Sequence, residues 1–293
     1  MIPNNNFSVL PWYTSLDQQN ARKWWAYDRV YPLFTQAGHL LPWQLLTPYD
    51  ASVQISSISR ILLFDGNTEE QLGNYTDLLR PFISLEKYEV LGVNAFIFGG
   101  QAMAFPSMSD GRYYLSMTIG NTTYYSEVFT IIQDTSPYLK IEWWDNEDFV
   151  MDAGIIVYKY ANGTQFRNEL YLCADIAKPE YIFEEEGETR DGYFFPQKQI
   201  SEKRYHFQFL ASEYLLDVMR FIRMADYAQI TKNGQTYTLD TFLLTPEWEG
   251  DGDIASVEAE FDTATVAKKV GLGYIKAQRG DFNDDFNNDY DNQ

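Results

Sequence analysis

The sequence predicts a mainly β fold: an N-terminal β-sandwich over residues 1–134, followed by an antiparallel, β-rich α+β domain of split-barrel type over residues 138–270. Three observations support this. The chain of 293 residues contains 22 Tyr and 20 Phe, residue types that favour pleated sheets. Short Gly-, Asn- and Pro-containing turns separate its apolar runs. Only one stretch, at about residues 212–225, repeats its apolar residues with helical spacing.

The clearest element is a predicted β-hairpin from Gly111 to Ile132. Every second residue of its first strand is apolar, which predicts a strand with one buried face: Tyr113, Leu115, Met117 and Ile119. Gly120-Asn121 supplies a type II′ turn, because glycine adopts the positive φ of the first turn position. The expected register pairs Ile119 with Thr122, Met117 with Tyr124, Leu115 with Ser126 and Tyr113 with Val128.

Further strands of the first domain are expected within Ala21–Phe34, Val53–Phe64 and Phe82–Phe98. Residues 135–137 form the predicted linker, where Pro137 biases its predecessor toward an extended backbone.

The second domain is expected to contain strands at Tyr138–Trp144 and Ile155–Tyr160. Asn162-Gly163 and Asn233-Gly234 are typical type I′ hairpin turns. In the helix, Ser212 is the expected N-cap, and one face carries the apolar residues Leu215, Val218, Met219, Ile222 and Ala225.

The net charge is −20, from 42 acidic and 22 basic residues. Such a chain repels phosphate backbones, so we expect no sequence-specific nucleic-acid binding. No run approaches 18 apolar residues and no secretory signal begins the sequence, so no membrane association is expected. The single cysteine, Cys173, excludes an internal disulfide and is interpreted as an inert core residue.

No catalytic, cofactor-binding or metal-binding residue is predicted. His39 and His206 are the only histidines, and no phosphate-binding glycine motif or nucleophile elbow occurs. A glycosidase needs two suitably separated carboxylates, and the acidic clusters at 145–148 and 184–186 could supply them. Solvated loops are the preferred interpretation of both clusters. Alternating Asp and Asn after residue 280 imitate the start of a calcium loop but lack its glycine and terminal glutamate.

Aromatic residues are the candidates for partner binding. In the pairs Trp24-Trp25 and Trp143-Trp144, adjacent rings point to opposite faces of a strand, so one ring is core and the other faces outward. Trp25 and Trp144 are taken as the outward rings, suited to a protein interface or to sugar stacking. The acidic tail, residues 271–293, carries an aromatic residue every fourth position, which predicts anchors in a groove: Phe282, Phe286 and Tyr290.

The segment Asp110 to Ile131, DGRYYLSM, a short turn and then TTYYSEVFTI, resembles a recurring segment in virion proteins of tailed phages that infect Bacteroidetes, including the crAss-like podoviruses. Two further stretches resemble tail and collar proteins of those phages in their general sequence character: GYFFPQKQISEKRYHF and FLLTPEWEGDGDIASVEAEFDT. The resemblance covers about residues 60–270. It implies a non-enzymatic part of a tail, collar or baseplate: a homo-oligomeric ring that contacts other virion proteins, located in the virion and assembled in the host cytoplasm.

Two other classes remain open. A carbohydrate-binding or adhesin module would use exposed Trp and Tyr in a groove that no partner chain covers. An acid-catalysed glycan hydrolase would need two carboxylates facing one cleft at about 5–10 Å.

Overall fold

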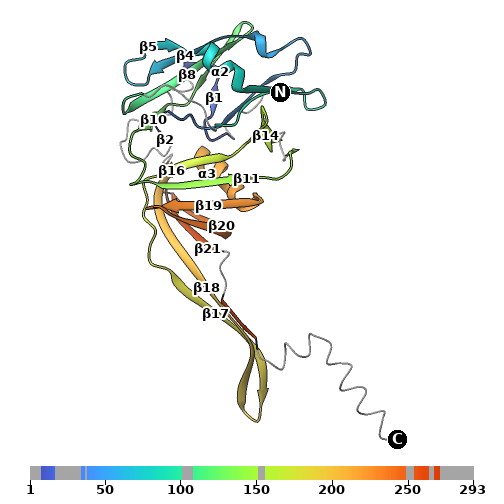
Figure 1. Ribbon diagram of the computed structural model, residues 1–293, viewed down its shortest axis with the longest axis vertical. Coiled ribbons are helices and arrows are strands. Elements are labelled where there is room, and N and C mark those ends of the chain that lie inside the picture. Colours follow the sequence, from blue (N-terminus) through green and yellow to red (C-terminus); the bar gives the residue numbers. More distant parts are fainter. Residues whose placement is uncertain are drawn as a thin grey trace, which may run out of the picture.

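The computed structural model describes residues 8–16, 34–36, 38–100, 108–150, 156–248, 254–263 and 267–270. The chain is mainly β with several antiparallel sheets and few helical residues, which confirms the predicted β-rich α+β class. Figure 1 shows two lobes that form the body of the molecule and a long hairpin that projects from the second lobe. Among the described residues, no helix has the length and apolar character needed to cross a bilayer.

The first lobe contains two sheets. The larger has the order β1-β9-β8-β10-β2, with β4 pairing β8 and β5 pairing β4. Its strands are β1 (Trp12–Tyr13), β2 (Phe34–Gln36), β4 (Ile58–Asp65), β5 (Gln71–Asn74), β8 (Gly111–Ile119), β9 (Thr122–Ser126) and β10 (Phe129–Ile132). The smaller has the order β3-β7-β6, from β3 (Trp43–Pro48), β6 (Ile83–Tyr88) and β7 (Val93–Phe98). The short helical turns between them are η2 (Ile55–Ser57), α2 (Thr76–Leu79) and η3 (Arg80–Phe82).

Aromatic rings join these two sheets in one core. The ring centroids of Trp12, on β1, and Trp43, on β3, lie 5.0 Å apart in an edge-on contact. Trp43 also stacks on Phe98 of β7 at 5.6 Å. Leu115 and Met117 of β8 belong to the same fully buried cluster. Two sheets that share one apolar layer are what the sandwich prediction describes.

The predicted hairpin forms β8 and β9. Ile119 pairs with Thr122 and Met117 with Tyr124, and Gly120 has a φ of 57°, so the turn and the first part of the register are confirmed. The last predicted pair is wrong, because Tyr113 lies opposite Phe129 instead of Val128. The prediction of one buried face is also wrong, since every residue from 113 to 117 is buried. The reason is position: β8 is an inner strand of its sheet, paired with β4, β9 and β10.

Glu127 explains the break in the register. Its side chain is fully buried between β9 and β10. The Tyr13 hydroxyl donates to Glu127 Oε2 at 2.7 Å, and the Val128 N–H donates to Oε1 at 3.1 Å. The Glu127 N–H donates to the Pro11 carbonyl at 2.8 Å. Because a buried carboxylate must be hydrogen-bonded, the chain leaves the ladder here to join β1 through Glu127.

The second lobe is built on one eight-stranded sheet of order β16-β11-β19-β20-β21-β18-β17, with β22 on β18. Its strands are β11 (Leu139–Trp144), β16 (Asn168–Leu172), β17 (Glu180–Arg190), β18 (Tyr193–Ser212), β19 (Tyr227–Lys232), β20 (Gln235–Trp248), β21 (Ile254–Thr263) and β22 (Ala267–Val270). Two small hairpins pair β12 (Phe149–Val150) with β13 (Ile156–Val157) and β14 (Tyr160–Ala161) with β15 (Thr164–Gln165). Both residues of each predicted type I′ turn have positive φ, which confirms the turns: Asn162-Gly163 and Asn233-Gly234.

The helix α3 spans Glu213–Met219 and continues as the 3-10 helix η5, Arg220–Met224. Four residues of the predicted inward face are buried: Leu215, Val218, Met219 and Ile222. The fifth, Ala225, follows the end of η5 and is half-buried, so the prediction is wrong for that residue. Ser212 occupies the N-cap position, but its side chain makes no capping hydrogen bond, contrary to the prediction. Ser212 is also the last residue of β18, where it is buried and paired with Ile254.

Both lobes share one continuous hydrophobic cluster that runs from Val9 to Phe261. At the predicted linker, the buried Lys232 ammonium donates to the Pro137 carbonyl at 2.6 Å and to the Ala174 carbonyl at 2.8 Å. The domain boundaries themselves stay predictions. Cys173 follows the end of β16 and is exposed, so its assignment to the core is wrong.

Candidate functional site

The most distinctive feature of the molecule is the arm, defined here as β17, the facing half of β18 and the turn between them (residues 180–204). Residues 204–212 of β18 pair with β21 inside the body, whereas residues 193–204 pair with β17. Figure 1 shows β17 and β18 extending beyond the body as a narrow ribbon. Asp191 and Gly192 at its tip have φ values of 52° and 81°, the type I′ geometry that turns the chain back.

Aromatic side chains on this arm face the solvent. The exposed fractions are 61% for Tyr181, 69% for Phe183, 72% for Tyr193 and 49% for Phe194. Tyr181 lies opposite Lys203 and Phe183 opposite Ser201, so both rings lie on the sheet face that carries Phe207 and Phe209 further along β18. Those two phenylalanines are buried in the body. The apolar stripe of the core therefore continues along the arm, where both rings stay largely exposed. The Lys203 ammonium lies over the Tyr181 ring, 5.7 Å from its centroid.

The arm is also acidic. β17 contains five glutamates and one arginine: Glu180, Glu184, Glu185, Glu186, Glu188 and Arg190. Lys198 Nζ contacts Glu186 Oε1 at 2.7 Å, and Gln199 Nε2 donates to Glu185 Oε1 at 2.7 Å. These cross-strand contacts hold the two strands together. The acidic cluster at 184–186 is exposed as predicted, but it lies in a strand, so its interpretation as a loop is wrong. In the cluster at 145–148, Asp145 is buried, so the prediction of a solvated loop is wrong for that residue.

One edge of the arm is open. Within the described part of the chain, β17 pairs only with β18, so its outer edge has no partner strand over residues 180–190. The opposite edge of the hairpin is covered by β22, which pairs with residues 198–201 of β18. An edge strand presents a row of unpaired N–H and C=O groups, which readily accept another strand.

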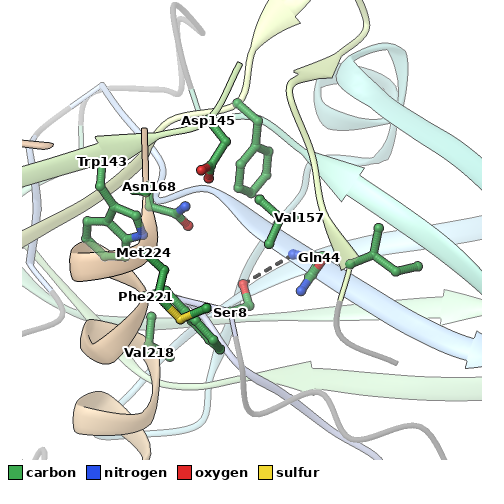
Figure 2. Close-up of a pocket in the computed structure, with 12 residues that line it drawn as sticks. Ser8, Gln44, Trp143, Asp145, Val157, Asn168, Val218, Phe221 and Met224 are labelled. Atoms are coloured by element: carbon green, nitrogen blue, oxygen red, sulfur yellow. Dashed lines mark hydrogen bonds between the residues drawn. The ribbon is translucent and has the colours of Figure 1, made fainter. Parts of the chain in front are cut away.

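A small cavity lies between the lobes and α3 (Figure 2). It has a volume of about 30 Å³, room for about two water molecules. Polar groups that line it come from both lobes: Ser8, Gln44, Asp145 and Asn168. The Gln44 N–H donates to Ser8 Oγ at 3.2 Å, while Gln44 Oε1 has no hydrogen-bond partner among the described residues.

Asp145 is the ionisable group of this cavity. Burial raises its pKa, opposed by the hydrogen bond that the Asp226 N–H donates to Asp145 Oδ1 at 3.2 Å. The cavity is too small for a sugar ring, and ligand sites are usually at least ten times larger. We therefore interpret it as a small gap in the packing between the lobes.

A buried ionic network lies on the other face of β11 and β16. His39 Nδ1 lies 2.7 Å from Glu169 Oε1, and Lys140 Nζ lies 3.2 Å from Glu169 Oε2. Lys140 also contacts Glu142 at 3.0 Å. Burial alone would raise the pKa of Glu169, but the hydrogen bond with His39 and the charges of His39 and Lys140 hold it below its usual value. The network links the loop before β3 to the second lobe.

The two histidines belong to separate ionic clusters. His206, on β18, lies 3.7 Å from Glu180 and 3.8 Å from Glu258, far along the sheet from the network of His39. In the described ranges, no group of three His, Cys, Asp or Glu side chains is arranged to hold a metal ion.

Of the predicted partner-binding residues, only Trp144 falls within the described ranges; Trp25, Phe282, Phe286 and Tyr290 lie outside them. Trp143 is buried and Trp144 is half-buried, as the paired-ring prediction requires. Tyr227 stacks on the Trp144 indole at 5.5 Å, and the Arg167 guanidinium lies 4.0 Å from its centroid. Because β19 and β16 flank β11 on opposite sides, these groups cover both faces of the indole. A sugar therefore has no open face of Trp144 on which to stack.

A polar depression of about 370 Å³ lies at the base of the arm. Its lining includes Lys178, Tyr205, Asn233, Gln235 and Tyr237. The buried Lys232 on its wall is already engaged by Asp175 at 2.7 Å and by two carbonyls.

The arm is not among the elements expected from the sequence, although the sequence contains a signal for it. Asp191-Gly192 is a strong type I′ turn between two β-rich runs. Periodicity reports only that alternate residues are apolar, and not whether anything covers them.

No protein-family model matches the chain, and no curated protein sequence matches it significantly.

Proposed function

We propose that the chain is a non-enzymatic structural component of a phage virion, part of a tail, collar or baseplate ring held together by contacts between its copies and with other virion proteins. The observation that carries the proposal is the arm, with four exposed aromatic rings on a ribbon that projects from the body. The likeness of Asp110 to Ile131 to phage virion segments supports the same role.

The energetics of the arm favour contact with another protein. A two-stranded hairpin is at best marginally stable in water. Burying one large apolar side chain contributes about 1.5–3 kcal/mol, so the four exposed rings are a substantial source of binding free energy. Clustered exposed apolar residues mark interaction surfaces in soluble proteins.

Ring closure requires two different surfaces on each subunit. The arm is one candidate. A second apolar surface lies on the first lobe, at the turn between β6 and β7, where Val90 is 99% and Leu91 is 38% exposed. The two surfaces belong to different lobes, as a head-to-tail contact requires.

The test is the mass of the purified full-length chain, measured by light scattering over a range of concentrations, with electron microscopy of the particles. We expect a closed oligomer for the wild type. The double variant Tyr181→Ser/Phe183→Ser should remain folded and lose assembly. Leu72→Ser is the matched control, because Leu72 is 43% exposed on β5 of the other lobe. A wild-type chain that stays monomeric at every concentration would contradict the proposal.

A carbohydrate-binding module is the second candidate, favoured by the depression at the base of the arm. Tyr205 and Tyr237, beside amide and ammonium groups, are the side-chain types that bind sugars. This candidate predicts glycan binding by the isolated chain, lost in Tyr237→Ala. An array of glycans that retains neither protein would exclude it.

A further inference from the structure

The ten residues that follow β22, residues 271–280, carry only positive charge, whereas the open edge of β17 and the remainder of the tail, residues 281–293, are acidic. From Thr263 to Gly280 the sequence contains four basic residues and no acidic one: Lys268, Lys269, Lys276 and Arg279. This stretch stands out in a chain with a net charge of −20. It also contains Leu272, Tyr274 and Ile275, residues with the β preference of a strand. We call residues 271–280 the basic segment; they lie outside the described residues.

The basic segment begins at the arm itself. β22 ends at Val270, which lies opposite Lys198 on the edge of β18 that faces away from β17. Beyond that point, the same edge of β18 offers only residues 193–197 before the turn. Five residues are too few for a ten-residue segment, and the β17 edge of the same chain lies on the far side of the hairpin.

Two β17 edges cannot easily pair with each other. Their alignment would bring the glutamates of one copy against those of the next, and like charges facing across a ladder are destabilising. The acidic edge thus discourages its own self-pairing and favours a strand that carries positive charge.

We propose that the open edge of β17 accepts the basic segment (residues 271–280) of a second copy of the chain as an added strand. Backbone hydrogen bonds to the edge provide the contact, and Lys276 and Arg279 lie against the glutamates of β17. Each copy offers one edge and one segment, so the contact is heterologous and closes into a ring or continues as a filament. The inference rests on the proposed function, because it names the contact through which copies associate.

Charge exchange tests this contact. The edge variant is Glu185→Lys/Glu188→Lys, and the segment variant is Lys276→Glu/Arg279→Glu. Both pairs are three residues apart, so in an antiparallel register each cation lies opposite one glutamate. Each alone places like charges at the contact, so we expect its self-association Kd to rise at least about tenfold over the wild type. The combined variant restores opposite charges and should assemble like the wild type. An equimolar mixture of the edge and segment variants should also assemble, because each contact between unlike copies is then complementary.

Controls separate this effect from net charge and from misfolding. Glu70→Lys/Glu89→Lys changes the net charge as the edge variant does, and Arg60→Glu/Arg223→Glu matches the segment variant; all four positions are exposed. Circular dichroism and thermal unfolding establish that every variant is folded. The masses of all chains are compared by light scattering at one ionic strength.

The outcomes distinguish the two proposals. Restored assembly in the combined variant and in the mixture would support strand addition. A wild-type oligomer that is indifferent to the charge changes, or a combined variant no better than the single ones, would overturn strand addition alone. A monomeric wild type would overturn the proposed function with it.

Discussion

The two halves of β18 carry the same kind of sequence in opposite surroundings. In the body, Phe207 and Phe209 are 2% and 7% exposed, and Phe207 packs against Phe209, Phe242 and Phe261. On the same sheet face of the arm, Phe183 is 69% exposed. The body half has β21 as a neighbour and α3 nearby, whereas the arm half has only β17 and the four residues of β22. An alternating aromatic pattern therefore specifies a strand with an apolar face, and the neighbouring elements decide whether that face is core or interface.

The largest expected loss of stability comes from a substitution in the body half of β18. Phe207→Ala should lower the free energy of unfolding by about 3–5 kcal/mol, because it opens a cavity among the three rings that pack against Phe207. Urea denaturation followed by tryptophan fluorescence measures this. A loss below about 1 kcal/mol would show that the body half of β18 is no more constrained than the arm.

The ionic network between the lobes should make the body sensitive to acid. The pKa of Glu169 is lowered from its usual 4.5, so its stabilising contribution is complete above that pH and is lost as the pH falls through the lower folded value. Glu169→Gln should cost about 2–4 kcal/mol at pH 7 and flatten the dependence of stability on pH below 5. Glu184→Gln on the arm is the matched control, with an expected change within about 0.5 kcal/mol. Thermal unfolding between pH 3 and 7 measures both; parallel curves for Glu169→Gln and the wild type would contradict the assignment.

Two glycines in equivalent turns, one in the body and one at the tip of the arm, allow the stability of these two regions to be compared. Gly234 ends the β19–β20 turn in the body with a φ of 77°, and Gly192 ends the arm with a φ of 81°. Neither has an atom within 4 Å of a new Cβ, so alanine strains only the backbone, by about 1–2 kcal/mol. Gly234→Ala should lower global stability by that amount. Gly192→Ala should instead speed amide hydrogen exchange in the arm and leave global unfolding nearly unchanged. Equal global losses in both variants would show that the arm unfolds together with the body.

The smallest effect on stability is expected for Phe183→Ala. An exposed ring contributes little to the monomer, so the free energy of unfolding should change by less than about 0.5 kcal/mol. If the arm is an interface, the same substitution should weaken self-association measured by light scattering. A stability loss as large as that of Phe207→Ala would mean that Phe183 packs inside its own chain.

Local chemistry made much of the fold predictable. Gly120, Asn162 and Asn233 mark their turns because each position needs a positive φ, and the register next to Gly120 follows from the turn. Prediction failed where distant residues intervene. The pairing of Tyr113 slips because Glu127 is drawn to Tyr13, which is 114 residues away. Cys173 looked like core because it follows an apolar strand, yet that strand ends one residue earlier.

In the candidate site, too, some features could be predicted from the sequence and others depend on contacts between distant residues. From the pair Trp143-Trp144 the sequence indicated one buried and one outward ring, since alternate residues of a strand face opposite ways. That Arg167 and Tyr227 occupy both faces of Trp144 depends on which strands flank β11, and sequence spacing does not encode this.

By itself, the sequence determined the β class, the positions of three tight turns, the buried face of the helix and the acidity of the chain, because each depends on a residue and its near neighbours. Only the tertiary structure decided which aromatic strands are covered, where the two lobes join and which strand edge stays open. These depend on contacts between residues far apart in the chain. For the arm that difference matters most: its sequence is that of a core strand, and its position past the end of β21 makes it a surface.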